Sequence, residues 1–187
     1  MNKLLLRGFV LSVMIFVFTA PVFATGPASV YKVKIKKVRL WNGTSWVTVY
    51  DALSGALDIA AVSSGASAGN FLSGLVVPDG TYTKVEVTPS PTFTYSGHDG
   101  ANYTTAAAGG SGGSLFGLAA AEAEWTVTLT GGNVPVAGEQ DFSATPITVL
   151  DGGADKKVRV SFNVANAIDT VGGDLWPAQP AVTMSIQ

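Results

Sequence analysis

The chain has 187 residues and carries 11 Lys and Arg against 13 Asp and Glu, which gives a formal net charge of −2. This balance provides no positive surface for nucleic acid or anionic lipid, so we expect neither as a partner. Only 13% of the residues are charged, so we expect an uncharged surface suited to close packing against neighbours. The absence of cysteine excludes a thiol nucleophile, a cysteine metal site and an acylated cysteine anchor.

The first 24 residues predict an export signal. Lys3 and Arg7 form a short positive start, an apolar run covers residues 9–18, and Val22 and Ala24 occupy the −3 and −1 positions of a cleavage site. This is the layout of a bacterial Sec signal peptide. The run is too short to span a bilayer comfortably, and no second apolar stretch follows it.

We therefore expect cleavage after Ala24 and a mature chain, residues 25–187, that has no membrane span and lies outside the cell or at its surface. The periplasm is the other compartment that such a leader allows. A pilin-type leader cut after Gly8 is the alternative, although Val13 stands where such leaders usually carry an acidic residue.

Alternating apolar residues predict a strand near the start of the mature chain. The phase of the alternation changes across residues 36–37. A β-bulge at that point would restore a single inward face; alternatively, one strand ends there and another begins. The inward candidates are Tyr31, Val33 and Ile35 before the change and Val38 and Leu40 after it.

Turn residues mark the next strands. The Asn-Gly pair at 42–43 is flanked by Trp41 and Trp46 and predicts a hairpin in which the two indoles touch. The Pro-Asp-Gly sequence at 78–80 separates two further strands.

Three stretches in the last third alternate between apolar and polar residues, which predicts strands with one buried and one solvated face. They cover residues 125–130, 158–164 and 182–186. The apolar row of the last stretch consists of Val182, Met184 and Ile186.

Two regions do not show a strand pattern. Residues 52–68 predict a short helix or an ordered crossover, and residues 97–114, rich in Gly, Ala and Ser, predict a flexible loop. The remaining pattern of roughly eight to nine strands with little helix predicts one all-β domain. We expect a two-sheet antiparallel β-sandwich over residues 25–187, of immunoglobulin-like or transthyretin-like type.

Four stretches of the mature chain carry a resemblance to a known family. They are Val-Lys-Ile-Lys-Lys-Val-Arg-Leu at 33–40, Leu-Asp-Ile-Ala at 57–60, the Gly-Thr-Tyr-Thr strand entry within 78–87, and Lys-Val-Arg-Val-Ser-Phe-Asn-Val-Ala at 157–165. In this order they resemble a family of uncharacterised bacterial extracellular β-sandwich domains, many of them on surface lipoproteins. The resemblance implies a β-sandwich at the cell surface with no established chemistry, although the acylated cysteine common in that family is missing here.

The catalytic motifs in the sequence have simple structural explanations. Gly-x-Ser-x-Gly occurs at 65–69 and 109–113, but both matches lie in low-complexity sequence, and His98 is the single histidine. Asp151 and Asp155 lack the alternating spacing of a calcium loop. We therefore expect no enzyme activity and no cofactor.

The leading functional hypothesis is a structural surface protein that self-assembles into a pilus-like extracellular filament or a coat by β-strand addition. Export, few charges, and strands near both ends of the mature chain motivate it. The alternative is that these strands pair within their own sheet. The candidate assembly residues are Tyr31, Val33, Ile35, Val38, Leu40, Val182, Met184 and Ile186.

A second hypothesis is an adhesion module that binds a surface glycan, because aromatic rings on a sheet can stack on sugars. Such rings more often form core contacts and cross-strand pairs. The candidate ligand-binding aromatics are Trp41, Trp46, Tyr95 and Tyr103.

Overall fold

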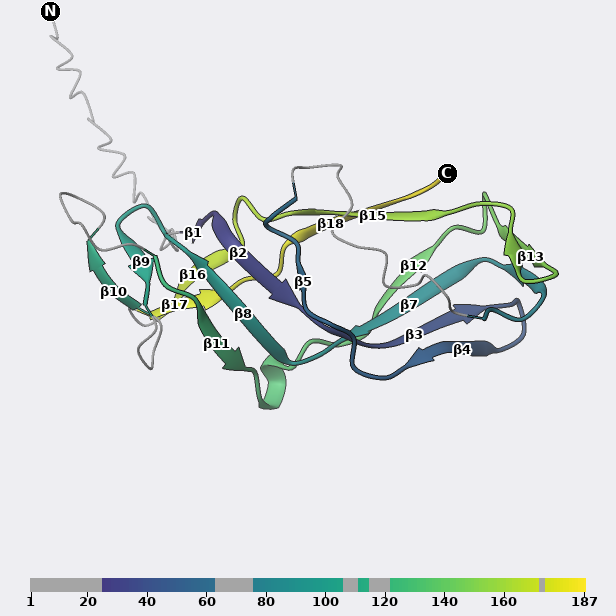
Figure 1. Cartoon of the computed structure of the whole chain (residues 1–187), viewed down its shortest axis with the longest axis horizontal. Helices are drawn as coiled ribbons and strands as arrows, with labels where there is room; N and C mark the ends of the chain where they lie inside the picture. Colours follow the sequence, from purple (N-terminus) through teal and green to yellow (C-terminus); the bar gives the residue numbers. More distant parts are fainter. Residues whose placement is uncertain (1–24, 63–75, 106–110, 115–121, 172–173) are drawn as a thin grey trace, which may run out of the picture.

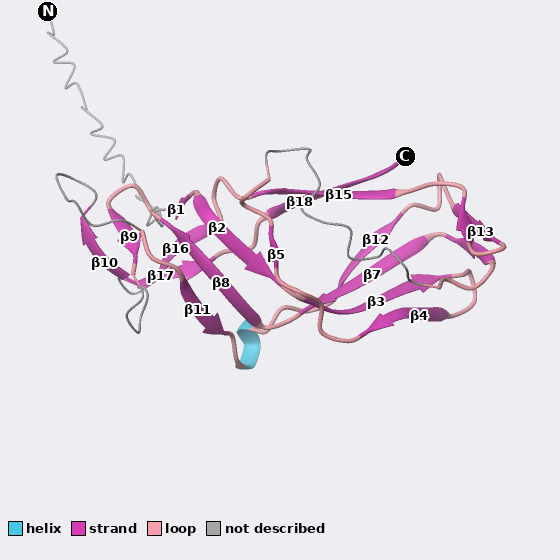
Figure 2. Ribbon diagram, in the orientation of Figure 1, coloured by secondary structure: helices cyan, strands magenta, loops and turns pink. Residues whose placement is uncertain are grey.

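The computed structural model describes residues 25–62, 76–105, 111–114, 122–171 and 174–187. These residues form an elongated antiparallel β-sandwich, and the helical content within them is one 3₁₀ turn at Gly131–Asn133 (Figures 1 and 2). The predicted all-β fold class is confirmed. None of the described residues belongs to a helix of the length and apolar character needed to cross a membrane.

Two pairs of nearly continuous strands run along the long axis (Figure 1). One pair is β2 (Ala28–Val33) with β3 (Ile35–Trp41), and the other is β7 (Lys84–Pro89) with β8 (Thr92–Gly97). The pairs lie antiparallel, β2 against β8 and β3 against β7. The backbone N–H of Ser90 donates to the carbonyl of Lys34 at 2.7 Å, which joins the two pairs where each changes direction.

Four further strands flank these pairs, two on each side. β5 (Leu57–Asp58) and β4 (Trp46–Asp51) lie on one side, while β11 (Trp125–Thr128) and β12 (Gly138–Asp141) lie on the other. The two resulting four-stranded sheets have the orders β11-β8-β2-β5 and β12-β7-β3-β4.

Three small sheets form the opposite layer of the sandwich. β1 (Thr25–Gly26), β16 (Ile168–Val171) and β17 (Asp174–Pro177) cover the half that contains β2. The other half is covered by a sheet of β14 (Gly153–Ala154), β13 (Ile147–Leu150) and β6 (Gly80–Tyr82). A two-stranded sheet of β15 (Val158–Asn163) and β18 (Ala181–Ile186) contacts the cores of both halves. We call the β15–β18 pair the ribbon.

Each half has its own hydrophobic core. The first core is made of Ala28, Tyr31, Val33, Ile59, Phe93, Tyr95, Ala167, Ile168 and Leu175. The second core is made of Ile35, Val38, Val85, Phe142 and Ile147, with Val158, Met184 and Ile186 of the ribbon packed against it.

The predicted β-bulge after Ile35 is confirmed. Ile35 pairs with Pro89 and Lys37 with Thr88, so Lys36 is the extra residue, and it is exposed. The bulge keeps Ile35 and Val38 on the same buried side despite their odd spacing. The predicted hairpin at 42–43 is also present: Trp41 pairs with Trp46, and the Asn42 side chain accepts hydrogen bonds from the backbone within the turn.

The structure differs from the helix alternative for the first region without a strand pattern and from the loop prediction for the second, while the ordered crossover of the first region stays a prediction. Among residues 52–62 the structure shows β5 and bends rather than a helix, and residues 63–68 lie outside the described residues. The loop predicted at 97–114 contains a hairpin of β9 (Asn102–Thr104) and β10 (Ser111–Ser114), with residues 106–110 not described. Tyr103 and Thr104 are buried, and their burial stabilises a strand. The Gly-rich composition of the region gives no indication of this strand.

Candidate functional site

The N-terminal candidates for assembly lie inside their own domain. β2 pairs with β8 on one edge and β5 on the other, and β3 pairs with β7 and β4. Tyr31, Val33, Ile35 and Val38 are buried, and Leu40 packs against the second core. This segment therefore has strand neighbours within the chain on both sides, with β5 pairing to Lys32 and Val33 of β2, and the alternative that it pairs in its own sheet is the one observed.

The C-terminal candidates lie in a different environment. β18 pairs with β15 over six residue pairs, and no third strand joins either one in the part of the chain that the structure describes. Met184 and Ile186 pack toward the second core, while Val182 is 49% exposed. β18 contains neither a charged residue nor a proline, which are common protections of a sheet edge.

The hydrogen-bond pattern identifies which backbone groups of the ribbon face outward. Lys157 and Gln187 exchange both backbone hydrogen bonds, at 2.7 and 2.8 Å. Antiparallel pairs alternate between bonded and non-bonded positions, and the ribbon register continues without a shift. The N–H groups of Val182, Met184 and Ile186 therefore point away from β15, and those of Val158, Val160 and Phe162 point away from β18.

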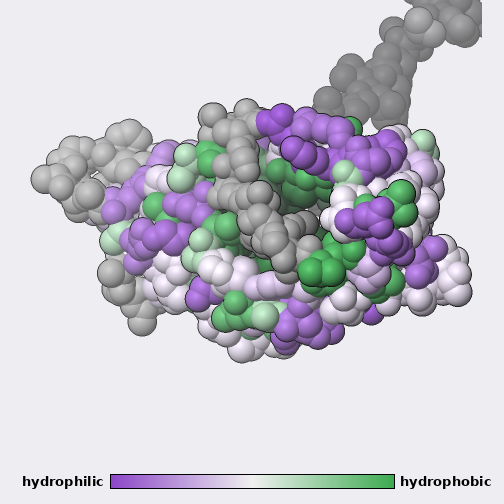
Figure 3. Space-filling view, turned by 45° about the vertical axis from the view of Figure 1, so that its right-hand side comes forward, coloured by the Kyte–Doolittle hydropathy of each residue, from purple (hydrophilic) through white to green (hydrophobic). Residues whose placement is uncertain are grey.

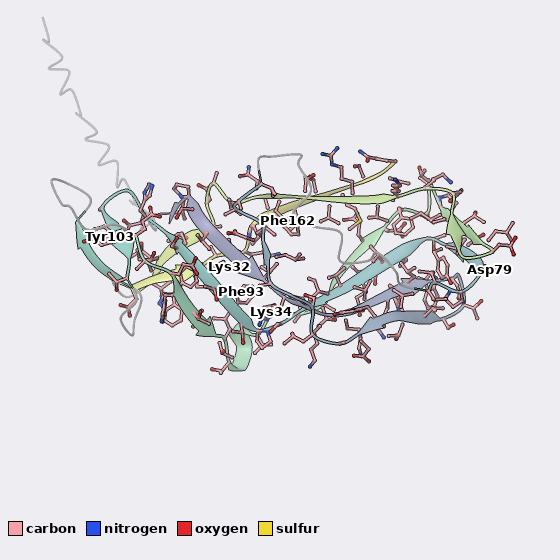
Figure 4. The ribbon with its side chains drawn as sticks, viewed as in Figure 1. Lys32, Lys34, Asp79, Phe93, Tyr103 and Phe162 are labelled. Atoms are coloured by element: carbon pink, nitrogen blue, oxygen red, sulfur yellow. The ribbon has the colours of Figure 1, made fainter. Side chains whose placement is uncertain are left out.

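A shallow groove lies at one end of the ribbon. It has a volume of about 210 Å³ and is lined by Ser161, Phe162, Asn163, Ala181 and Thr183. Figure 4 labels Phe162 on this ribbon, and Phe162 packs against the first core. Figure 3 shows hydrophobic residues around a hollow near the middle of one face and in smaller patches elsewhere on it.

The structure separates the four candidate aromatics. Trp41 and Trp46 touch across their hairpin, with ring centroids 5.5 Å apart, and each indole is half-buried. The Arg39 guanidinium lies 5.2 Å from the Trp46 ring and makes two hydrogen bonds to Glu86, of 2.8 and 2.6 Å. This cluster of two indoles and an ion pair is a rigid, partly exposed platform.

The prediction that Tyr95 and Tyr103 bind a ligand is wrong. They are 0% and 5% exposed, so neither offers a ring face to a ligand. Tyr95 instead donates from its hydroxyl to the Leu175 carbonyl at 2.6 Å, and burial raises the pKa of that hydroxyl. Figure 4 shows Tyr103 near one end of the long axis and Asp79 near the other.

His98 and Asp99 have structural partners. His98 Nδ1 accepts from the backbone N–H of Gly100, and Asp99 accepts from Ala101, Asn102 and Thr170. Burial of Asp99 opposes its ionisation, but these hydrogen bonds outweigh it and hold its pKa below the usual range. Within the described residues, no three His, Cys, Asp or Glu side chains are grouped as a metal site would require.

A pocket that the sequence did not indicate lies beside the β16–β17 hairpin. Its volume is about 530 Å³. The Trp176 ring packs on Trp125, with centroids 5.4 Å apart and the planes 65° from parallel. β16 and β17 are short and are separated by two glycines in the sequence, so no sequence pattern distinguished Trp176 as a functional residue. The lining residues are Leu129, Asp169, Val171, Asp174, Trp176 and Pro177.

Comparison with protein-family models, with curated proteins and with solved structures finds no match for this chain.

Proposed function

We propose that this protein is an exported, non-enzymatic surface protein whose copies join by strand pairing along the ribbon. The observation that carries the proposal is the pair of unpaired edges, one on β15 and one on β18, within the described residues. Because the two edges differ, β18 of one copy pairs with β15 of the next. A contact between two different surfaces does not end at a dimer, and it continues into an open filament where the rotation between copies does not close a ring.

The composition of the ribbon supports this pairing. An added strand finds three outward N–H groups on each edge, and main-chain hydrogen bonds supply affinity that depends little on side chains. β18 has no charge to repel its neighbour, and β15 carries only Arg159. Export is part of the proposal, so protein recovered from outside the cell should begin at Thr25 when its intact mass is measured.

Proline substitutions on the two edges test the proposal. Val182→Pro removes an outward N–H from β18, and Val160→Pro removes one from β15, while the bonds between the two strands are kept. Each variant alone should remain monomeric in light scattering. A mixture of the two should form dimers and nothing larger, since each supplies the edge that the other lacks.

Alanine variants at the same positions serve as matched controls. Val182→Ala and Val160→Ala keep the N–H groups and should assemble like the unchanged protein. Dimers of Val160→Pro alone would show that β18 pairs with β18, and unimpaired filaments of both proline variants would remove the ribbon from the mechanism.

A second candidate function is glycan binding on the Trp41–Trp46 platform. It is favoured by the two half-buried indoles fixed beside the Arg39–Glu86 pair, which together offer a stacking face and hydrogen-bonding groups. Binding on a glycan array should then fall at least about tenfold in Trp46→Ala, in line with the loss of one stacked aromatic ring. Trp176→Phe, far along the chain, should bind as before; equal signals from Trp46→Ala and the parent would exclude this face.

A further inference from the structure

We propose that the pocket beside β16 and β17 binds an organic cation, an ammonium or a guanidinium group. Its volume of about 530 Å³ lies in the range of small-molecule sites. The inference is independent of assembly through the ribbon, because none of the pocket residues belongs to β15 or β18.

The register of the hairpin places the polar and aromatic walls of the pocket together. Asp169 pairs with Trp176, and Val171 pairs with Asp174. Directly opposed residues and residues two apart along a strand share one face, so all four side chains stand on the same face of the hairpin. One face therefore presents an indole between two carboxylates.

Residues of the facing sheet hold the walls of the pocket in place. The Tyr95 hydroxyl donates to the Leu175 carbonyl at 2.6 Å, and the Tyr31 hydroxyl donates to the Ala178 carbonyl at 2.8 Å. Trp176 is fixed by Trp125, whose ring in turn packs on Tyr95 with centroids 5.6 Å apart. A site fixed in this way loses little conformational entropy when a ligand enters.

The charge of the pocket selects the ligand. Two of its six lining residues are acidic and none is basic, so an anion is repelled. The Oδ1 atom of Asp169 is enclosed and has no hydrogen-bond partner among the described residues, so this carboxylate is not fully compensated by the protein. A cation in the pocket is attracted by the negative charge of Asp169 and Asp174 and interacts with the face of Trp176.

A neutral sugar fits these walls less well. Each sugar hydroxyl both donates and accepts, whereas the carboxylates only accept and the indole N–H is the one side-chain donor among the six lining residues. A guanidinium or ammonium group only donates, which matches two carboxylates.

Titration with n-butylguanidinium tests the proposal on the folded protein. The indole N–H signal of Trp176, assigned through its loss in Trp176→Phe, should shift saturably in ¹H–¹⁵N NMR spectra. Asp169→Asn and Asp174→Asn should each weaken binding at least about tenfold, whereas Asp151→Asn, on an exposed turn, should not change it. Addition of n-butanol, which has the same alkyl chain without the charge, should leave the signal in place.

Two further probes distinguish the sources of the cation. N-acetylarginine amide represents a side chain of a partner protein, and spermidine represents a free polyamine; the one that binds more tightly identifies the source. Equal affinity for n-butylguanidinium in Asp169→Asn, Asp174→Asn and the parent would overturn the proposal, as would an equal response to n-butanol or no saturable shift. Should Asp169→Asn fail to fold, Asp174→Asn alone decides the question by the same readout.

Discussion

Replacing Val38 with aspartate is expected to unfold most of the protein. Val38 is 1% exposed and lies on β3, between Tyr50 of β4 and Val87 of β7. Val38 is buried in a core of apolar side chains that includes Ile35, Val85 and Ile147, so the new carboxylate would be buried in apolar surroundings. Such a change costs more than about 4 kcal/mol, a large part of the stability of an ordinary domain. Loss of the cooperative thermal transition followed by circular dichroism is the measurement.

Two further aspartate variants test whether the loss of stability follows the burial of the replaced residue. Thr48→Asp lies on the exposed side of β4, opposite Arg39, and should change stability by less than about 0.5 kcal/mol. Val160→Asp, on the ribbon, should fall between the two because Val160 is only half-buried. Similar melting shifts for Val38→Asp and Thr48→Asp would mean that the inward face of β3 is assigned to the wrong side.

Deleting residues 25–34 is expected to abolish folding of the monomer. The deletion removes β1 and β2, and β2 is a central strand that separates β8 from β5. It also removes Tyr31 and Val33 from the first core and the hydrogen bond from Tyr31 to the opposite layer. Far-ultraviolet circular dichroism and size-exclusion chromatography should both show an unfolded chain.

The matched control for the deletion is addition of the missing peptide in trans. A peptide of residues 25–34 should restore the monomer, and a scrambled peptide of the same composition should not. A folded deletion variant that polymerises only when the peptide is added would contradict the pairing seen here and would make this segment the assembly strand.

The strands could be predicted from the sequence wherever the local pattern of apolar residues agrees with the final packing. The alternation through Tyr31, Ile35 and Val38 and the turn beside Trp41 contain enough local information to predict strands, bulge and hairpin. Edge exposure was not predictable, because it depends on which strands pair, and pairing is a long-range property. The alternating row of β18 is the same whether its outer edge is free or covered.

The roles of the aromatic residues could not be predicted from the sequence either. Tyr95 and Trp46 both occur in strands rich in β-branched and aromatic residues, yet one is buried and the other half-exposed. Burial is decided by what packs on the strand, here Ile168 and Leu175 from much later in the chain. Trp176 became a candidate only once the fold placed it between Asp169 and Asp174.

The two buried tyrosine hydroxyls that join the layers set an alkaline limit on the fold. Burial raises the pKa of Tyr31 and Tyr95 well above the usual value of about 10, so the folded protein keeps both protons while the unfolded chain loses them. Their contribution to the free energy of unfolding is therefore complete below about pH 10. Above that pH, each of the two tyrosines lowers the free energy of unfolding by about 1.4 kcal/mol per pH unit. Titration of these two phenols in strong base is accordingly coupled to separation of the two layers, and the part of the tyrosinate absorbance that comes from them reports unfolding.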